Sequence, residues 1–268
     1  MNKYLRFLTD RNFRFNILNA RGLYRKLSDE AFLKRKYKMI FQRELNLETP
    51  QTFNEKLQWL KLYNRRPEYT RMVDKQGVKQ LVAEKIGQEY IIPTLGVWDS
   101  FDEIDFESLP EQFVLKCTHD SGGLVICRDK AKLDVEAARK KIQKSMRRNY
   151  YYSSREWPYK NVKPRIIAEV YMQDGQTLSL PVYKIFNFGG EPRIIQTIQN
   201  DKTKEETIDY FDVDWNVLQM RQNFPNSNVP LARPEKLQEM LQLARELSKG
   251  FPFLRTDFYV INGRVYFS

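Results

Sequence analysis

The chain has 268 residues, of which 41% are hydrophobic and 13% aromatic, so it can bury a core and is not a disordered protein. Its two cysteines are too few for a disulfide framework, and its single histidine excludes zinc sites built on ordinary Cys and His ligand sets. The formal net charge of +11 is concentrated in residues 1–66, which hold 16 Lys and Arg against 6 Asp and Glu.

The basic N-terminus interleaves its arginines with apolar side chains, namely Tyr4, Leu5, Phe7, Leu8, Phe13, Phe15, Ile17 and Leu18. This pattern suits a helix lying on an anionic membrane surface, and equally an ordinary helix with a solvated basic face. No apolar run is long enough to span a membrane, and no secretory signal is evident. We therefore expect a cytoplasmic protein, peripheral at the inner face of the membrane if this helix binds lipid. Nucleic acid is a weaker expectation, because the charge excess is local and no known reader motif appears.

The first 90 residues are predicted to be mostly helical, over 28–45, 52–63 and 74–86. Ser28 is the expected N-cap of the first helix. Thr52 and Glu55 have the spacing of a capping box, and Gly87 is the stop of the third helix. On the second helix we expect inward-facing apolar side chains at Phe53, Leu57, Trp59 and Leu60.

From Tyr90 onward the pattern changes to short apolar strands. They are predicted at 91–98, 113–118, 124–127, 165–171, 182–188, 193–199, 207–213, 254–260 and 264–268, with helices at 134–149 and 234–248. Pro93 indicates an edge strand, while Gly189-Gly190 and Asn262-Gly263 indicate hairpin turns. The predicted fold class is α+β, with mostly antiparallel pairing.

The segment Phe113–Cys127 carries the clearest chemical pattern. Lys116 lies inside an apolar strand, five residues before Ser121-Gly122-Gly123. A mid-strand lysine is costly without a partner, and small residues let backbone amides approach an anion. This suits a nucleotide triphosphate, with the turn as a lid, although the spacing is neither that of a P-loop nor of a Rossmann fingerprint. A surface hairpin with an outward lysine is the alternative.

Two carboxylates stand in apolar strands downstream of this hairpin. Glu169 lies near the end of the strand at 165–171, and Asp257 follows Arg255 by two residues. A carboxylate in such a setting requires a cation, and Mg²⁺ bound to a triphosphate supplies one.

The order of these motifs resembles the ATP-grasp superfamily, and is most similar to the TupA-like branch associated with teichuronopeptide and capsular polysaccharide biosynthesis. The resemblance covers Thr52 to Ser268, through the segments 52–59, 74–75, 113–123, 155–159, 165–171, 183–192 and 255–259. It implies two α+β subdomains that grip ATP, and a division into 1–50 (basic helical region), 51–112 (N-terminal subdomain), 113–170 (lid and ATP-binding subdomain) and 171–268 (C-terminal subdomain).

The resemblance also implies a role for each matching position. The residues implied to contact ATP are Lys75, Lys116, His119, Ser121, Gly122, Gly123, Glu169, Val170, Tyr171, Met172, Asp174 and Gln176. Among them Lys116 would hold the α- and β-phosphates, 121–123 the lid, 169–172 the adenine hinge, and Asp174 or Gln176 the ribose. Lys184 and Arg255 are implied beside the transferred phosphate, and Asp257 as the Mg²⁺ ligand.

The implied reaction is carboxylate–amine ligation through an acyl phosphate, without a protein nucleophile. The implied partners are an acidic glycan or a lipid-linked sugar precursor, and an amine such as an amino acid. A glycan kinase, a glycosyltransferase and a degenerate, non-catalytic ATP-binding module are the alternatives.

Two departures from the family pattern stand out. Val182 replaces the aspartate that usually precedes Tyr-Lys, and the metal-binding glutamate expected after the Asn262-Gly263 turn has no counterpart before Ser268. We therefore expect either a C-terminal subdomain that is cut short, or a variant in which Asp257 is the one obvious metal ligand.

Three smaller features leave alternatives open. His119 is a turn residue or a phosphate contact, and Cys117 and Cys127 are two free apolar side chains or a facing pair. Trp157 and the Tyr150–Tyr152 run pack in the core or stack on sugar rings.

Overall fold

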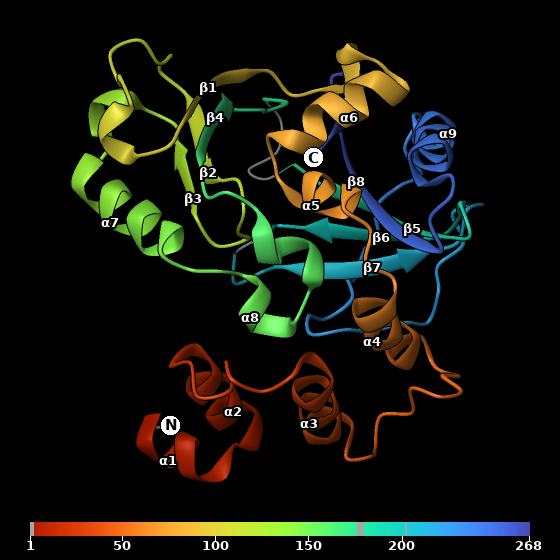
Figure 1. Cartoon of the computed structure of the whole chain (residues 1–268). Helices are drawn as coiled ribbons and strands as arrows, with labels where there is room; N and C mark the ends of the chain where they lie inside the picture. Colours follow the sequence, from red (N-terminus) through yellow and green to blue (C-terminus); the bar gives the residue numbers. More distant parts are fainter. Residues whose placement is uncertain (1–2, 176–179, 202) are drawn as a thin grey trace. The chain divides into compact units, whose positions relative to one another are not determined.

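The computed structural model describes residues 3–175, 180–201 and 203–268 (Figure 1). Its α-helices are α1 (Lys3–Thr9), α2 (Arg11–Ala20), α3 (Asp29–Phe41), α4 (Phe53–Tyr63), α5 (Glu68–Val73), α6 (Gly77–Ile86), α7 (Val135–Met146), α8 (Tyr151–Ser154) and α9 (Leu237–Ser248). Its strands are β1 (Thr94–Trp98), β2 (Phe113–Cys117), β3 (Leu124–Cys127), β4 (Ile166–Val170), β5 (Val182–Phe188), β6 (Glu191–Gln199), β7 (Thr207–Phe211), β8 (Phe253–Ile261) and β9 (Arg264–Phe267). Within these residues, no helix is both long and apolar enough to cross a membrane.

The strands form two sheets. A four-stranded sheet has the order β1-β4-β2-β3, with β1 at its edge directly after Pro93, as predicted. A five-stranded sheet has the order β7-β6-β5-β8-β9 and is antiparallel throughout. The α+β class is therefore confirmed.

The chain divides into two compact units. Unit 1 comprises Met1–Val78, Val97–Ser108 and Leu115–Ile167, and unit 2 comprises Lys79–Gly96, Leu109–Val114 and Ala168–Ser268. The four expected subdomains stay a prediction, and each unit is described by itself below.

Local signals in the sequence act where expected. The Thr52 hydroxyl accepts the Glu55 N–H at 3.4 Å, and the Glu55 carboxylate accepts the Thr52 N–H at 2.8 Å, which is a complete capping box at the start of α4. Asn262 and Gly263 both adopt positive φ values, 50° and 73°, as a tight hairpin turn between β8 and β9 requires.

Three predicted helices differ in their limits. The first ends at Phe41 because Gln42 takes a left-handed conformation with φ 56°. The third begins at Gly77 rather than Asp74, because Asp74 is extended, and α5 before it was not predicted. The last begins at Leu237 rather than Pro234.

The inward face predicted for α4 is wrong in part. Phe53 and Trp59 are exposed, whereas Glu55 is buried on this helix. The capping box explains the exception, because the Glu55 carboxylate is held by the Gln51 and Thr52 amides.

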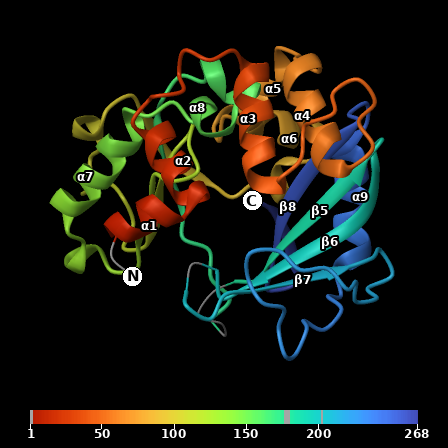
Figure 2. The same ribbon diagram turned by 90° about the horizontal axis from the view of Figure 1, so that it is seen from below.

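The core of unit 2 lies between α9 and one face of the five-stranded sheet. Helix α9 packs against β5, β6 and β8, as Figures 1 and 2 show. Its stripe of buried side chains includes Leu237, Met240, Leu241, Ala244 and Leu247. On alternate positions of the strands, Ile185, Ile195 and Phe258 are fully buried. The half-buried residues between them, such as Lys184 and Asp257, belong to the other face.

Candidate functional site

Strands β2 and β3 and the turn between them form the predicted hairpin in unit 1. Lys116 is half-buried between Leu115 and Cys117, which are both fully buried. The side chains of a strand alternate in direction, so Lys116 lies on the face opposite to these two. The strand thus holds a lysine on its more open face, as a phosphate contact requires.

Three side chains hold the base of the turn. Asp120 is buried and accepts the Gly122 N–H at 3.0 Å, and its other carboxylate oxygen accepts the Ser145 hydroxyl of α7. His119 donates from Nε2 to the main-chain oxygens of Ser145 and Arg148, at 3.2 and 3.1 Å. Burial lowers the pKa of His119, which favours the neutral ring. His119 therefore links the turn to the end of α7.

The three small residues of the turn differ in their surroundings. Ser121 and Gly122 are exposed, while Gly123 is buried. A Cβ atom at Gly123 would stand 2.4 Å from the Cys117 Sγ and 2.6 Å from the Ser145 Oγ, whereas one at Gly122 would meet nothing closer than 3.5 Å. Gly123 is thus required for packing, and only 121–122 are open to a ligand.

Lys75 supports the same turn from the chain preceding α6. Its ammonium donates to the main-chain oxygen of Cys117 at 3.0 Å and to that of Asp120. Its own N–H donates to the Thr118 oxygen at 3.1 Å. Next to it, Asp74 forms an ion pair of 2.9 Å with Arg165. The Asp74-Lys75 pair therefore positions the hairpin relative to the start of β4.

Cys117 and Cys127 are both buried and form no disulfide, which agrees with two small apolar side chains rather than a bonded pair. Burial raises the pKa of the Cys117 thiol, so the thiolate is disfavoured and this cysteine is not activated.

The predicted hinge, 169–172, begins within the last two residues of β4, in unit 2. Glu169 is buried, and its carboxylate forms an ion pair with Lys79 of α6. Lys79 also donates to the Ile92 oxygen at 2.7 Å and to the Thr94 hydroxyl at 3.0 Å. The Glu169 side chain is thus held by the protein, and the adenine contact predicted for 169–172 would come from the backbone.

Val170 is the last residue of β4, and the chain leaves the strand after it. The Val170 N–H donates to the Pro93 oxygen at 3.1 Å, whereas Tyr171, Met172 and Asp174 lie outside any helix or strand and are half-buried. Gln176, the alternative ribose contact, lies outside the described residues.

The five-stranded sheet brings Lys184 and Asp257 together. They stand directly opposite each other in the pairing of β5 with β8. The same row continues to Gln196 on β6 and Tyr210 on β7. Gln196 donates to the Tyr210 hydroxyl at 2.7 Å. Directly opposite residues share one face, so this is a polar row across four strands.

Arg255 lies beside Asp257 on β8 and adds a positive charge to this polar row. Its Nε and Nη2 atoms contact the two carboxylate oxygens of Asp257 at 2.7 and 2.8 Å. The two residues are separated by one position on β8 and therefore point to the same face. The Asp257 side chain is 19% exposed and that of Arg255 46%, so both remain accessible to a ligand.

Whether the protein alone can hold a metal ion depends on how its carboxylates are grouped. Within the residues that the structure describes, no three His, Cys, Asp or Glu side chains form a group that could do so. A single carboxylate suffices for Mg²⁺ when triphosphate oxygens and waters supply the other ligands. Asp257 fits a metal that arrives with a nucleotide, and not a metal bound in advance.

Three contributors to these sites were not predicted from the sequence. They are Lys79, the partner of Glu169; Ser145, which holds Asp120; and Gln196, the neighbour of Lys184 in the polar row. Lys79 lies one helical turn after Lys75, which is the only sequence signal for it. The other two partners come from distant elements, and no local pattern indicates them.

A comparison with protein-family models finds one that matches residues 55–268, described as TupA-like ATPgrasp. The chain belongs to the TupA-like ATP-grasp family. The match covers both candidate regions and begins after α3, so it leaves out the basic N-terminal helices. No curated protein matches the chain.

Three solved structures that are similar to this TupA-like ATP-grasp protein share little sequence identity with it. D-alanine–D-alanine ligase from Bacillus anthracis, complexed with ATP, has 14% identity and a TM-score of 0.43, over 73% of this chain and 53% of that one. The ATP-grasp ligase PsnB with its minimal precursor has 8% identity and a TM-score of 0.42, and the match covers 92% of this chain and 66% of PsnB. D-cycloserine synthetase DcsG has 12% identity and a TM-score of 0.41, and the match covers 75% of this chain and 62% of DcsG. The chain spans between half and two thirds of the length of these proteins.

Proposed function

We propose that the protein is an ATP-dependent carboxylate–amine ligase that acts on a surface polysaccharide or its precursor and joins an amino acid to a uronic acid. Membership of the TupA-like ATP-grasp family supports the use of ATP. The single observation that carries the chemistry is the cross-strand pair of Lys184 and Asp257, with Arg255 on the same face. This is a site with two cationic groups for phosphate and one carboxylate for a metal.

In this proposal each half contributes separately. Lys116, on the open face of β2, holds the phosphates of ATP, and the exposed 121–122 tip covers them. The main chain of 169–172 pairs with adenine, while Asp257 holds Mg²⁺. The metal supplies charge neutralisation when bound, and Arg255 and Lys184 add positive charge beside the transferred phosphate.

The reaction needs positioning and no protein nucleophile. A carboxylate oxygen of the sugar takes the γ-phosphoryl group from ATP, which leaves as ADP, and an amine then attacks the acyl carbon and releases phosphate. The neutral His119 and the protonated Cys117 agree with this, since neither is activated as a nucleophile.

The test is release of ADP and inorganic phosphate in the presence of a uronate acceptor, an amino acid and Mg²⁺. We expect turnover only when all are present, and a loss of about 10²-fold or more in Lys116→Ala. The matched control is Lys130→Ala, a lysine just beyond the same hairpin. Phosphate found on the sugar instead of in solution would show a kinase. Transfer from a nucleotide sugar without ATP would show a glycosyltransferase, and no ATP binding at all a degenerate module.

A further inference from the structure

The N-terminal helices form a folded region outside the family match. Helices α2 and α3 and the segments beside them bury a small core made of Phe15, Tyr24, Phe32, Leu33, Tyr37 and Leu45. The Phe15 and Tyr24 rings stack with centroids 4.7 Å apart. Residues 11–50 are therefore an ordered part of unit 1 and not a loose basic tail.

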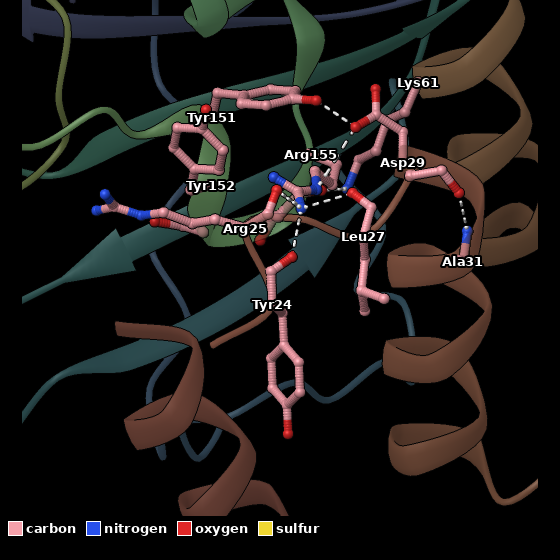
Figure 3. Close-up of polar contacts among 12 residues, drawn as sticks. Tyr24, Arg25, Leu27, Asp29, Ala31, Lys61, Tyr151, Tyr152 and Arg155 are labelled. Atoms are coloured by element: carbon pink, nitrogen blue, oxygen red, sulfur yellow. Dashed lines mark hydrogen bonds and ion pairs between the residues drawn. The ribbon is translucent and has the colours of Figure 1, made fainter. Parts of the chain in front are cut away.

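Arg155 fastens this region to the part of unit 1 that the family model covers. Its side chain is 1% exposed and donates to the main-chain oxygens of Tyr24 at 2.8 Å and Leu27 at 3.2 Å. Asp29, the first residue of α3, lies 3.5 Å from the Arg155 Nε and accepts the Tyr151 hydroxyl (Figure 3). A buried arginine that satisfies several carbonyl oxygens is a rigid attachment.

Helix α1 differs from its neighbours because none of its residues is buried. Tyr4, Leu5 and Leu8 are 81%, 53% and 69% exposed. Leu5 and Leu8 are three positions apart and Tyr4 and Leu8 four apart, so the three side chains form an exposed apolar face on one side of the helix. Leu23, 63% exposed, adds a further apolar side chain nearby in the sequence.

Basic residues are frequent in the segment that contains this apolar face. Residues 3–26 hold seven Lys and Arg against one acidic residue, Asp10, which forms an ion pair with Arg6. Lys3, Arg11, Arg21 and Lys26 are exposed. Seven helical residues span about 10 Å, far less than the hydrocarbon core of a bilayer, so α1 can only lie along a surface.

We infer that α1 and the basic residues up to Lys26 dock the protein onto an anionic lipid bilayer. The apolar side chains enter the headgroup region, and the cationic side chains pair with lipid phosphates. Nucleic acid offers the charge but no apolar medium for Tyr4, Leu5 and Leu8, so the bilayer is the better complement. Through Arg155 this surface is tied to unit 1. The consequence that the enzyme then meets a lipid-linked acceptor rests on the proposed function, whereas lipid binding itself does not.

The experiment is co-sedimentation of the full chain with vesicles of phosphatidylcholine, with and without phosphatidylglycerol. We expect binding to the anionic vesicles only, weakening as salt is raised. The variant Tyr4→Ser/Leu5→Ser/Leu8→Ser should bind at least about tenfold more weakly. Its melting temperature should match the wild type, because no residue of α1 is buried. The control Val217→Ser/Val229→Ser, at exposed positions of unit 2, should bind as the wild type does.

Single charge variants separate the contribution of the cationic side chains from that of the apolar ones. Each of Arg11→Gln, Arg21→Gln and Lys26→Gln should weaken binding to anionic vesicles by about fivefold. Absence of wild-type binding to anionic vesicles, or an unchanged affinity in the triple serine variant, would overturn the inference. So would displacement from the vesicles by duplex DNA at equal charge concentration. ATP turnover on a water-soluble acceptor should be the same in the triple serine variant and the wild type, so that failure of the proposed ligase activity is recognised independently.

Discussion

Lys75 and Lys184 are both expected to contact the nucleotide, but their surroundings differ. In unit 1, the Lys75 ammonium is bonded to the main-chain oxygens of Cys117 and Asp120, which hold the hairpin turn. In unit 2, Lys184 stands on a half-buried sheet face opposite Asp257, which in turn contacts Arg255. Polar groups around the hairpin turn hold the backbone, whereas Lys184, Asp257 and Arg255 share a partly exposed sheet face, where we expect the ligand.

The same contrast holds for the acidic residues. Asp120 is buried and has its two carboxylate oxygens occupied by Gly122 and Ser145. The Asp257 carboxylate is paired with a partly exposed arginine, and a ligand can compete for such a contact. Chemistry is therefore expected on the sheet face, and stability effects at the polar residues that hold the hairpin turn.

The largest expected effect is on activity, at Asp257. The change Asp257→Asn removes the charge that would hold Mg²⁺, and we expect ATP turnover to fall by about 10² to 10³-fold. Glu246→Gln, which alters an exposed carboxylate paired with Lys249, is the matched control and should retain full turnover. Equal turnover in the two variants would remove Asp257 from the site.

The next effect is on stability, at the glycines of the hairpin. Gly123→Ala should lower the free energy of unfolding by about 1 to 3 kcal/mol, because its Cβ overlaps the Cys117 Sγ and the Ser145 Oγ. Gly122→Ala is the control with open space, and should stay within about 0.5 kcal/mol of the wild type. Urea unfolding of both variants measures the difference, and similar values for the two would contradict the packing account.

A direct comparison of the two lysines comes third. Lys75→Met leaves the oxygens of Cys117 and Asp120 without their donor, and should cost about 1 to 2 kcal/mol of stability. Lys184→Met should leave stability nearly unchanged but reduce ATP turnover. Urea titration and turnover assays on both variants test this. Loss of turnover in Lys75→Met together with loss of stability in Lys184→Met would show that the roles of the two lysines are exchanged.

The smallest effect is a pH dependence in unit 1. Burial, assisted by Lys61, lowers the pKa of Lys36 from 10.5 to about 8. Between these values the unfolded chain binds more protons than the folded one, so this group makes stability rise with pH over that window. We expect a gain of up to about 1 kcal/mol between pH 8 and 10, after allowance for solvent screening.

The variant Lys36→Met should reduce this rise, because it removes one titrating amine. Lys61 keeps its own share, since burial lowers its pKa as well. Lys26→Met, an exposed lysine, should leave the rise unchanged. Thermal unfolding at several pH values gives the measurement. A rise of the same size in Lys36→Met and the wild type would assign the pH dependence to another group.

The sequence by itself determined the elements whose causes are local. The capping box of Thr52 and Glu55 and the turn at Asn262-Gly263 each depend on residues within a few positions of one another. For the same reason the hairpin of 113–127 and its mid-strand lysine were predictable, and the ordered series of motifs indicated the family that the match to 55–268 shows.

Only the tertiary structure decided which polar groups meet. Strand register sets Lys184 opposite Asp257 and Gln196, and the packing of α7 sets Ser145 against Asp120. Phe53 and Trp59 fit a helical apolar stripe, yet they are exposed. Contacts between residues far apart in the chain depend on how whole elements pack, and burial follows from that packing rather than from the side chain alone.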